Sequence, residues 1–269
     1  MYSHKLAAFG AVVALLCIGS SAQAAAIDFS TLQVNGSATA TPTALRLTDG
    51  SNLGDPMDPN SNIGEAGSAY ISTAFNSYLT FTSSFTFSMT NTGFSPLADG
   101  LTFIIQNDPN GAMAVGGGGG GVGANGLASN IGIGFQSWDN NRVSFFRNGG
   151  ITGGPIHNFN LGDQDDLVDV TVAYDGTNLS YSAFNHTTGL TLADSRTFHL
   201  RSLGPQVYFG FTGGTGLSYS IQDVTNWDLT VGPGTGAVPE PAAWALMLLG
   251  FAGMGGALRR SRRVIRAAT

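Results

Sequence analysis

The chain has 269 residues, and residues 25–237 combine five arginines with fifteen aspartates and one glutamate, a net charge of −11. This part contains no lysine, so it cannot neutralise phosphates or anionic headgroups, which excludes nucleic acid as a partner. The one cysteine, Cys17, lies outside it, which excludes disulfides and thiol chemistry. The remaining length is enough for one large β domain with a substantial core.

The first 24 residues have the layout of a signal peptide. His4 and Lys5 precede an apolar stretch from Leu6 to Ile18, and Ala22-Gln23-Ala24 supplies the small residues that signal cleavage requires. We therefore expect residues 1–24 to direct export and the rest of the chain to act outside the cytoplasm.

The middle of the chain alternates apolar residues with polar ones. From Leu79 to Met89 the odd positions are mainly apolar and the even positions carry hydroxyl groups, which predicts a strand with one buried face. The same period recurs in the runs Leu101–Ile105, Ile131–Phe135, Val168–Tyr174, Leu179–Tyr181, Val207–Phe211 and Trp227–Val231. No stretch here has helical spacing, so residues 25–231 are predicted to form an all-β, antiparallel two-sheet sandwich. The turn signal Asp175-Gly176 predicts a hairpin between two of these runs.

The C-terminal segment follows a Gly/Pro-rich linker, residues 232–237. A breaker, Val238-Pro239-Glu240-Pro241, precedes an uncharged apolar run, residues 242–258, and then four arginines within residues 259–263. Arginines stay on the cytoplasmic side of a membrane, so residues 264–269 are expected in the cytoplasm and the β domain across the membrane. One interpretation is a permanent anchor. However, a 17-residue helix rises about 25 Å against a hydrocarbon core of about 30 Å, and four glycines weaken it.

Residues 238–263 resemble the PEP-CTERM sorting signal of Gram-negative bacteria, with Pro239, Glu240 and Pro241 as the motif. The resemblance implies recognition by an exosortase and transient anchoring in the inner membrane by the C-terminal helix. It also implies release to the cell surface, the outer membrane or an exopolysaccharide matrix.

Three short segments suggest a sugar site. Such a site needs a carboxylate to accept from hydroxyls, backbone amides made accessible by glycine, a side-chain amide and an aromatic face. The chain offers these as Asp99 in residues 98–103, a glycine loop in residues 116–126, and Trp138 and Asn140 in residues 135–140.

These residues resemble the legume-lectin (L-type) domain. The likeness is carried by Ala98-Asp99-Gly100-Leu101, the glycine loop, Phe135-Gln136-Ser137-Trp138-Asp139-Asn140, and the segments 209–216 and 222–227. It implies a jelly-roll sandwich of the concanavalin type, with a cis peptide bond before the aspartate. It also implies that Asp99, an amide near Gly119 or Gly120, and Asn140 hold one sugar, with Trp138 stacked beside it.

The metal site is where the chain departs from the family pattern. The family places two acids, two residues apart, as ligands of a calcium–transition-metal pair that positions the sugar-binding residues. Here Gly134 and Gln136 stand at those positions, and Asn140, Asp139 and backbone carbonyls are what remains for a hard cation. We therefore expect no metal cofactor, with bound calcium as the alternative. Either the site is preorganised without one, or the fold has been kept and binding weakened.

Several features have a plainer structural interpretation. The glycine run is equally typical of low-complexity slack, Trp138 equally suits a core position, and Trp227 is expected in the core. Glucanases share the sandwich, but they need Glu-x-Asp-x-x-Glu on one strand, whereas Glu65 stands alone and Asp163, Asp165 and Asp166 are typical of a solvated loop.

The sequence therefore predicts a non-catalytic protein that binds a glycan or exopolysaccharide. The alternative is a structural surface or matrix protein that keeps the sandwich without binding sugar. A glycoside hydrolase is the least favoured interpretation.

Overall fold

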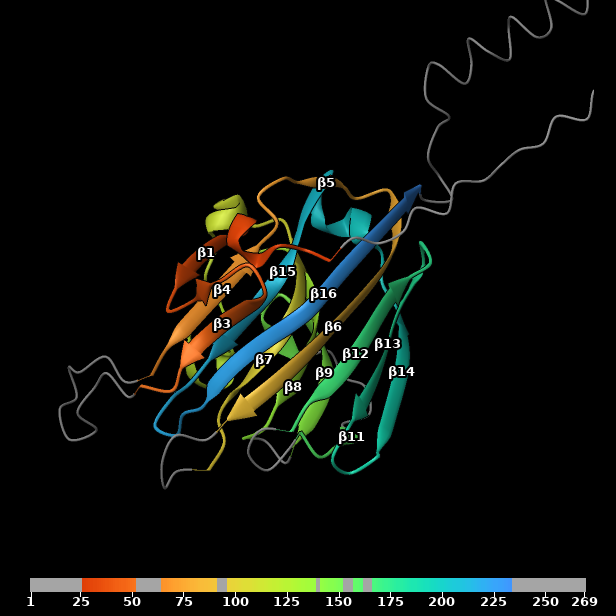
Figure 1. The fold of residues 1–269 in the computed structure, drawn as a ribbon. Helices are drawn as coiled ribbons and strands as arrows, with labels where there is room; N and C mark the ends of the chain where they lie inside the picture. Colours follow the sequence, from red (N-terminus) through yellow and green to blue (C-terminus); the bar gives the residue numbers. More distant parts are fainter. Residues whose placement is uncertain are drawn as a thin grey trace, which may run out of the picture.

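The computed structural model describes residues 26–51, 64–90, 96–138, 141–151, 157–161 and 166–233, which form two antiparallel sheets packed face to face (Figure 1). Within these ranges no helix is long and apolar enough to cross a membrane. The expected signal peptide and sorting segment lie outside the described residues.

The first sheet has nine strands in the order β1-β4-β15-β7-β8-β9-β10, with β5 paired to β15 and β11 paired to β9. All of its pairs are antiparallel. Its strands are β1 (Gln33–Gly36), β4 (Ala66–Tyr70), β5 (Phe75–Asn76), β7 (Gly100–Gln106), β8 (Asn130–Gln136), β9 (Arg142–Arg147), β10 (Gly150–Ile151), β11 (His157–Asn158) and β15 (Gln206–Gly214).

The second sheet has seven strands in the order β14-β13-β12-β6-β16-β3-β2. The predicted hairpin joins β12 to β13, and its turn is closed by Asp175, whose carboxylate accepts from the amides of Thr177 and Asn178. The strands are β2 (Thr39–Ala40), β3 (Ala44–Asp49), β6 (Leu79–Thr90), β12 (Val168–Tyr174), β13 (Asn178–Asn185), β14 (Thr191–Thr197) and β16 (Ile221–Pro233). β16 thus continues two residues beyond Val231, into the segment assigned to the linker.

The predicted fold class is confirmed, because the described residues form these strands and only four short 3-10 helices. The helices are η1 (Phe29–Thr31), η2 (Gly111–Met113), η3 (Gly119–Gly121) and η4 (Leu200–Leu203).

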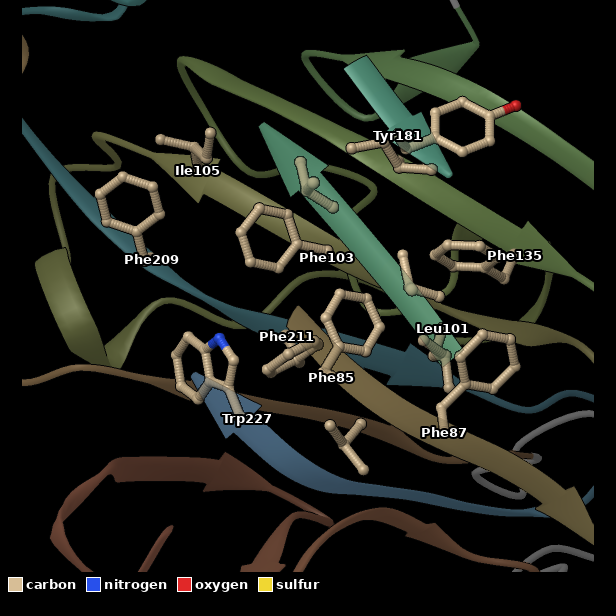
Figure 2. Close-up of a cluster of buried hydrophobic side chains, with 14 of the residues drawn as sticks. Phe85, Phe87, Leu101, Phe103, Ile105, Phe135, Tyr181, Phe209, Phe211 and Trp227 are labelled. Atoms are coloured by element: carbon tan, nitrogen blue, oxygen red, sulfur yellow. The ribbon is translucent and has the colours of Figure 1, made fainter. Parts of the chain in front are cut away.

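The core lies between the sheets and is rich in aromatic rings (Figure 2). The alternation in β6 turns Phe85 and Phe87 inward, where Phe85 stacks on Phe103 of β7 with ring centroids 5.7 Å apart and meets Phe211 of β15 edge-on at 4.9 Å. Phe87 contacts Phe135 of β8 at 4.9 Å. Interdigitation of side chains from both sheets removes a large apolar area from water, which is the main force that holds the sheets together.

Trp227 of β16 lies in the core, as the sequence predicted. A register shift between Thr225 and Asp228 in the pairing with β6 marks an irregularity at this point of the strand. The indole is fully buried, lies 4.8 Å from the ring of Phe211, and donates from Nε1 to Ser83 Oγ at 2.9 Å.

Candidate functional site

Asp99 enters β7 through a cis peptide bond after Ala98, as predicted. Its amide donates to the carbonyl of Gly214, the last residue of β15, at 3.0 Å. The hydroxyl of Ser220, in the loop between β15 and β16, donates to the carbonyl of Ala98 at 2.7 Å. The backbone on both sides of this bond is therefore tied to the neighbouring strand and loop.

The carboxylate of Asp99 lies deep at this edge of the sandwich. The residue is 7% exposed, and its Oδ2 is buried without a hydrogen-bond partner among the described residues. Burial raises the pKa of this carboxyl to about 6. A buried acceptor without a donor is unfavourable, so a hydrogen-bond donor that reached Asp99 would be bound favourably.

The glycine loop, residues 116–126, packs against β15 of the nine-stranded sheet. A Cβ at Gly118 would overlap with the carbonyl oxygen of Glu65, and one at Gly123 would come within 2.6 Å of the carbonyl oxygen of Gly213. The carbonyl of Val122 accepts from Thr212 Oγ1 at 2.8 Å. Close backbone contact therefore requires glycine at positions 118 and 123, so this part of the loop is not low-complexity slack.

Gly119 and Gly120 differ from these glycines, because nothing lies within 4 Å of where their Cβ atoms would be. The amide of Gly119 is already used, since it donates to the carbonyl of Thr215 at 2.8 Å. Gly120 is exposed, and its amide donates to no described residue. The geometry therefore favours Gly120 over Gly119 as the free amide donor.

Asp99, the glycine loop and the β15–β16 loop converge on one spot. A Cβ at Gly216 would lie 3.2 Å from Asp99 Oδ2 and 3.5 Å from the Cα of Gly119. The turn at Gly216 is closed by its own amide, which donates to the carbonyl of Ser218 at 3.0 Å. Leu217, at the tip of this loop, is 67% exposed.

Trp138 follows β8 on the other side of Asp99. Its amide lies 3.4 Å from the carbonyl oxygen of Asp99, and its side chain is 57% exposed, so it is not a core residue. Asn140 and Asp139 lie outside the described residues. The structure thus brings Asp99, Gly119, Gly120 and Trp138 to one edge and leaves Asn140 unplaced.

Gln136 belongs to the same edge, although the sequence pointed to it only as a missing metal ligand. It pairs with Gly100 across the β7–β8 ladder, is 6% exposed, and donates from Nε2 to the carbonyl of Gly120 at 3.1 Å. Its Oε1 is a second buried acceptor without a partner among the described residues. The hydrogen bond between Gln136 and Gly120 depends on the register of the strands. The alternation of residues in β8 was therefore the only sequence signal that pointed to Gln136.

The residues at the family's two acidic positions do not fit a metal. Gly134 and Gln136 carry no carboxylate, and a side chain at position 134 would overlap with the ring of Phe146. Among the residues that the structure describes, no three His, Cys, Asp or Glu side chains lie close enough together to hold a metal ion.

An open groove of about 360 Å³ lies on the seven-stranded sheet, lined by Thr80, Thr82, Tyr174 and Thr230 among others. Register places it at the start of β6 and the end of β16, the opposite end of these strands from Asp99. It contributes nothing to the site around Asp99.

Comparison with known families gives two matches. A family model described as the legume lectin domain matches residues 26–242, and one described as the PEP-CTERM protein-sorting motif matches residues 237–263. Comparison with curated proteins gives no match.

Several solved structures share the fold. Lectin II from Ulex europaeus has a TM-score of 0.65 at 17% identity, over 79% of this chain and 100% of its own. Arcelin-5, a lectin-like defense protein from Phaseolus vulgaris, has a TM-score of 0.62 at 21% identity, over 75% of this chain and 92% of its own. A lectin from Bauhinia forficata in complex with GalNAc has a TM-score of 0.61 at 22% identity, over 78% and 99% respectively. At these identities the likeness concerns the fold.

Proposed function

Because the chain belongs to the legume lectin family, we propose that it is an exported, non-catalytic protein that binds a glycan or exopolysaccharide at the edge around Asp99. The observation that carries the proposal is the buried carboxylate of Asp99, which has no donor among the described residues and lies at the same edge of the sandwich as the exposed Gly120 and Trp138. Sugar hydroxyls supply the donors that this carboxylate lacks.

In the proposed mode, Asp99 accepts hydrogen bonds from one or two sugar hydroxyls. The amide of Gly120 donates to a ring or hydroxyl oxygen, which reaches it because no side chain covers positions 119 and 120. The indole of Trp138 stacks on the C–H face of the sugar, and the amide of Asn140 completes the hydroxyl contacts.

The sorting motif supports the proposed destination. Residues 237–263 match a PEP-CTERM protein-sorting motif, which supports processing by an exosortase after transient anchoring in the inner membrane. The protein would then act at the cell surface, the outer membrane or in an exopolysaccharide matrix. There the repeated units of a polymer would raise the overall affinity by multivalency, which would offset the weak affinity of a single site.

The position of Glu65 favours binding over hydrolysis. Glu65 is 4% exposed, and its carboxylate accepts from the amides of Asp49 at 2.8 Å and Gly50 at 3.1 Å, an arrangement that holds the end of β3. A general acid must reach the glycosidic oxygen, and this carboxylate is committed to the backbone.

Truncation of Trp138 is expected to weaken glycan binding about 5- to 10-fold without changing the melting temperature. Stacking on an exposed aromatic ring contributes about 1 kcal/mol, whereas an exposed side chain contributes little to folding. A glycan array with the full-length protein, followed by titration of the best ligand against Trp138→Ala, measures both effects.

The matched control is Tyr78→Ala, which removes another exposed aromatic ring, from the segment just before β6. Equal affinities for the parent and Trp138→Ala would remove the stacking role. If the parent binds no glycan, the structural alternative is favoured, and release of reducing sugar would indicate a hydrolase.

Glycan binding is expected to be strongest above pH 7 and to weaken as the pH falls through about 6. The pKa of Asp99 is raised by burial to about 6, and only its ionised form is purely an acceptor for sugar hydroxyls. Protonation below that pH should lower the affinity by up to about tenfold per pH unit. Titrations between pH 5 and 8, with circular dichroism to verify folding, measure the profile. A flat profile would mean that Asp99 does not contact the sugar.

A further inference from the structure

Position 134 is closed to any side chain. Gly134 lies in β8, and the space beside it is filled by the ring of Phe146 from β9, which is 2% exposed. The pairing of Gly134 with Ser144 places Phe146 two residues further along the same face of the sheet. An acid at this position would therefore require Phe146 to leave a packed site.

Position 136 carries a neutral amide in place of the family's carboxylate, and the amide nitrogen is committed to a hydrogen bond. Gln136 Nε2 donates to the carbonyl of Gly120 at 3.1 Å and so ties the glycine loop to β8. A glutamate or aspartate has no such donor when ionised, and it would face the carbonyl oxygen with a negative charge. The contact is thus specific to an amide.

Neutral hydrogen bonds hold the other parts of the site. Ser220 Oγ donates to the carbonyl of Ala98 at 2.7 Å, and the amide of Asp99 donates to the carbonyl of Gly214 at 3.0 Å. Thr212 Oγ1 holds the carbonyl of Val122 at 2.8 Å and lies 2.7 Å from Thr102 Oγ1. Each buried bond of this kind fixes its two segments relative to each other, because leaving either group unpaired is unfavourable.

From these contacts we infer that the site is held in its binding geometry without a divalent cation. Gln136 and the ring of Phe146 stand where the family's metal-binding acids would stand, and the amide of Gln136 positions the glycine loop. The part of this inference that concerns glycan affinity rests on the proposed function, whereas the part that concerns folding and metal content does not.

The first test uses the purified full-length protein. We expect elemental analysis to find less than stoichiometric calcium, manganese and zinc. The melting temperature should be the same with EDTA, with added Ca²⁺ and with added Mn²⁺. A stoichiometric metal, or a fall in melting temperature on chelation, would overturn the inference. Neither readout depends on a glycan. A protein that binds no sugar, but whose melting temperature does not change with EDTA, would therefore refute the proposed function and leave the inference about the metal intact.

The second test addresses Gln136 as a positioning residue. In Gln136→Glu the bond to the carbonyl of Gly120 is lost, so hydrogen exchange at the amides of Gly117 and Gly123 should become about tenfold faster, the factor that corresponds to one hydrogen bond. The matched control, Gln206→Glu, makes the same change at an exposed position of β15 and should leave exchange unchanged.

The outcomes of this test are distinct. Unchanged exchange in Gln136→Glu would show that the loop is held without Gln136 and would overturn its positioning role. If Gln136→Glu does not fold, Gln136→Ala is measured in its place, since it removes the donor without adding a charge. Where the parent binds a glycan, its affinity should be the same with and without EDTA. The affinity of the Gln136 variant should be about tenfold lower than that of the parent.

Discussion

Replacing Asp99 by asparagine is expected to abolish measurable glycan binding and, at the same time, to stabilise the protein at pH 7. Asparagine keeps the shape of the side chain but replaces one acceptor oxygen with a donor and removes the charge. A site built to accept two hydroxyl donors rejects the change strongly, by about a hundredfold or more in affinity. The gain in stability follows because the ionised carboxylate is buried without a partner among the described residues.

The sign of the stability effect follows from the pKa of Asp99, which burial raises to about 6. The folded state prefers the protonated acid, so this group favours folding fully below the pKa of the unfolded chain, and the benefit is lost as the pH rises through about 6. Asp99→Asn should therefore melt higher by about 2–4 °C above pH 6, corresponding to about 1 kcal/mol after allowance for screening, and by little below about pH 4.

Differential scanning fluorimetry between pH 4 and 8, combined with glycan titration, measures both effects of Asp99→Asn. The control is Asp175→Asn, because the Asp175 carboxylate accepts hydrogen bonds within its own turn, so this variant should melt slightly lower. A lower melting temperature for Asp99→Asn at pH 7 would show that the carboxylate has a stabilising partner, against the structure.

Truncation of Trp227 should have the largest effect on stability, a loss of about 3–5 kcal/mol in the free energy of unfolding in Trp227→Ala. The indole is fully buried and lies near Phe211, with ring centroids 4.8 Å apart (Figure 2). The ring of Phe29 lies 6.3 Å from it, so truncation leaves a cavity in the core. The truncation also removes the hydrogen bond that the indole Nε1 donates to Ser83 Oγ. Urea unfolding followed by circular dichroism measures the change.

Trp227→Phe separates packing from hydrogen bonding. It keeps much of the ring volume but removes the donor to Ser83, so we expect a smaller loss, about 1–2 kcal/mol. Trp138→Ala, which removes an indole of the same size from an exposed position, should leave the free energy of unfolding unchanged. A loss in Trp227→Ala no larger than in Trp138→Ala would contradict the central position of Trp227 in the core.

The fold could be predicted from the sequence because successive side chains of a strand point to opposite faces, so apolar residues recur at every second position. In β6 the alternation from Leu79 to Met89 predicted both the strand and its buried face, and the pairing of β12 with β13 followed from the turn signal at Asp175. The cis bond before Asp99 was predicted only through the resemblance to the lectin domain, since no local pattern indicates it.

What could not be predicted depends on contacts between distant segments. Glu65 looked isolated, yet its carboxylate holds the end of β3, because the adjacent strands place it where it accepts from the amides of Asp49 and Gly50. Asp166 was expected in a solvated loop, which is wrong, because it is 7% exposed and accepts from Asn185 Nδ2 at 3.3 Å. The bond between Gln136 and Gly120 and the occupied amide of Gly119 likewise arise from strand register and loop packing.

The direction of β16 determines which way the site faces. The strand begins at Ile221, next to the loop whose Ser220 hydroxyl donates to the carbonyl of Ala98, and its 13 residues end at Pro233. At about 3.3 Å per residue, about 40 Å separate the two ends of this strand. Any segment that follows Pro233 is therefore joined to the domain at the end of β16 that is remote from Asp99. If the sorting segment is anchored and then cleaved as proposed, the site around Asp99 would lie at the end of the domain away from the membrane, and after release the new chain end would not lie beside it.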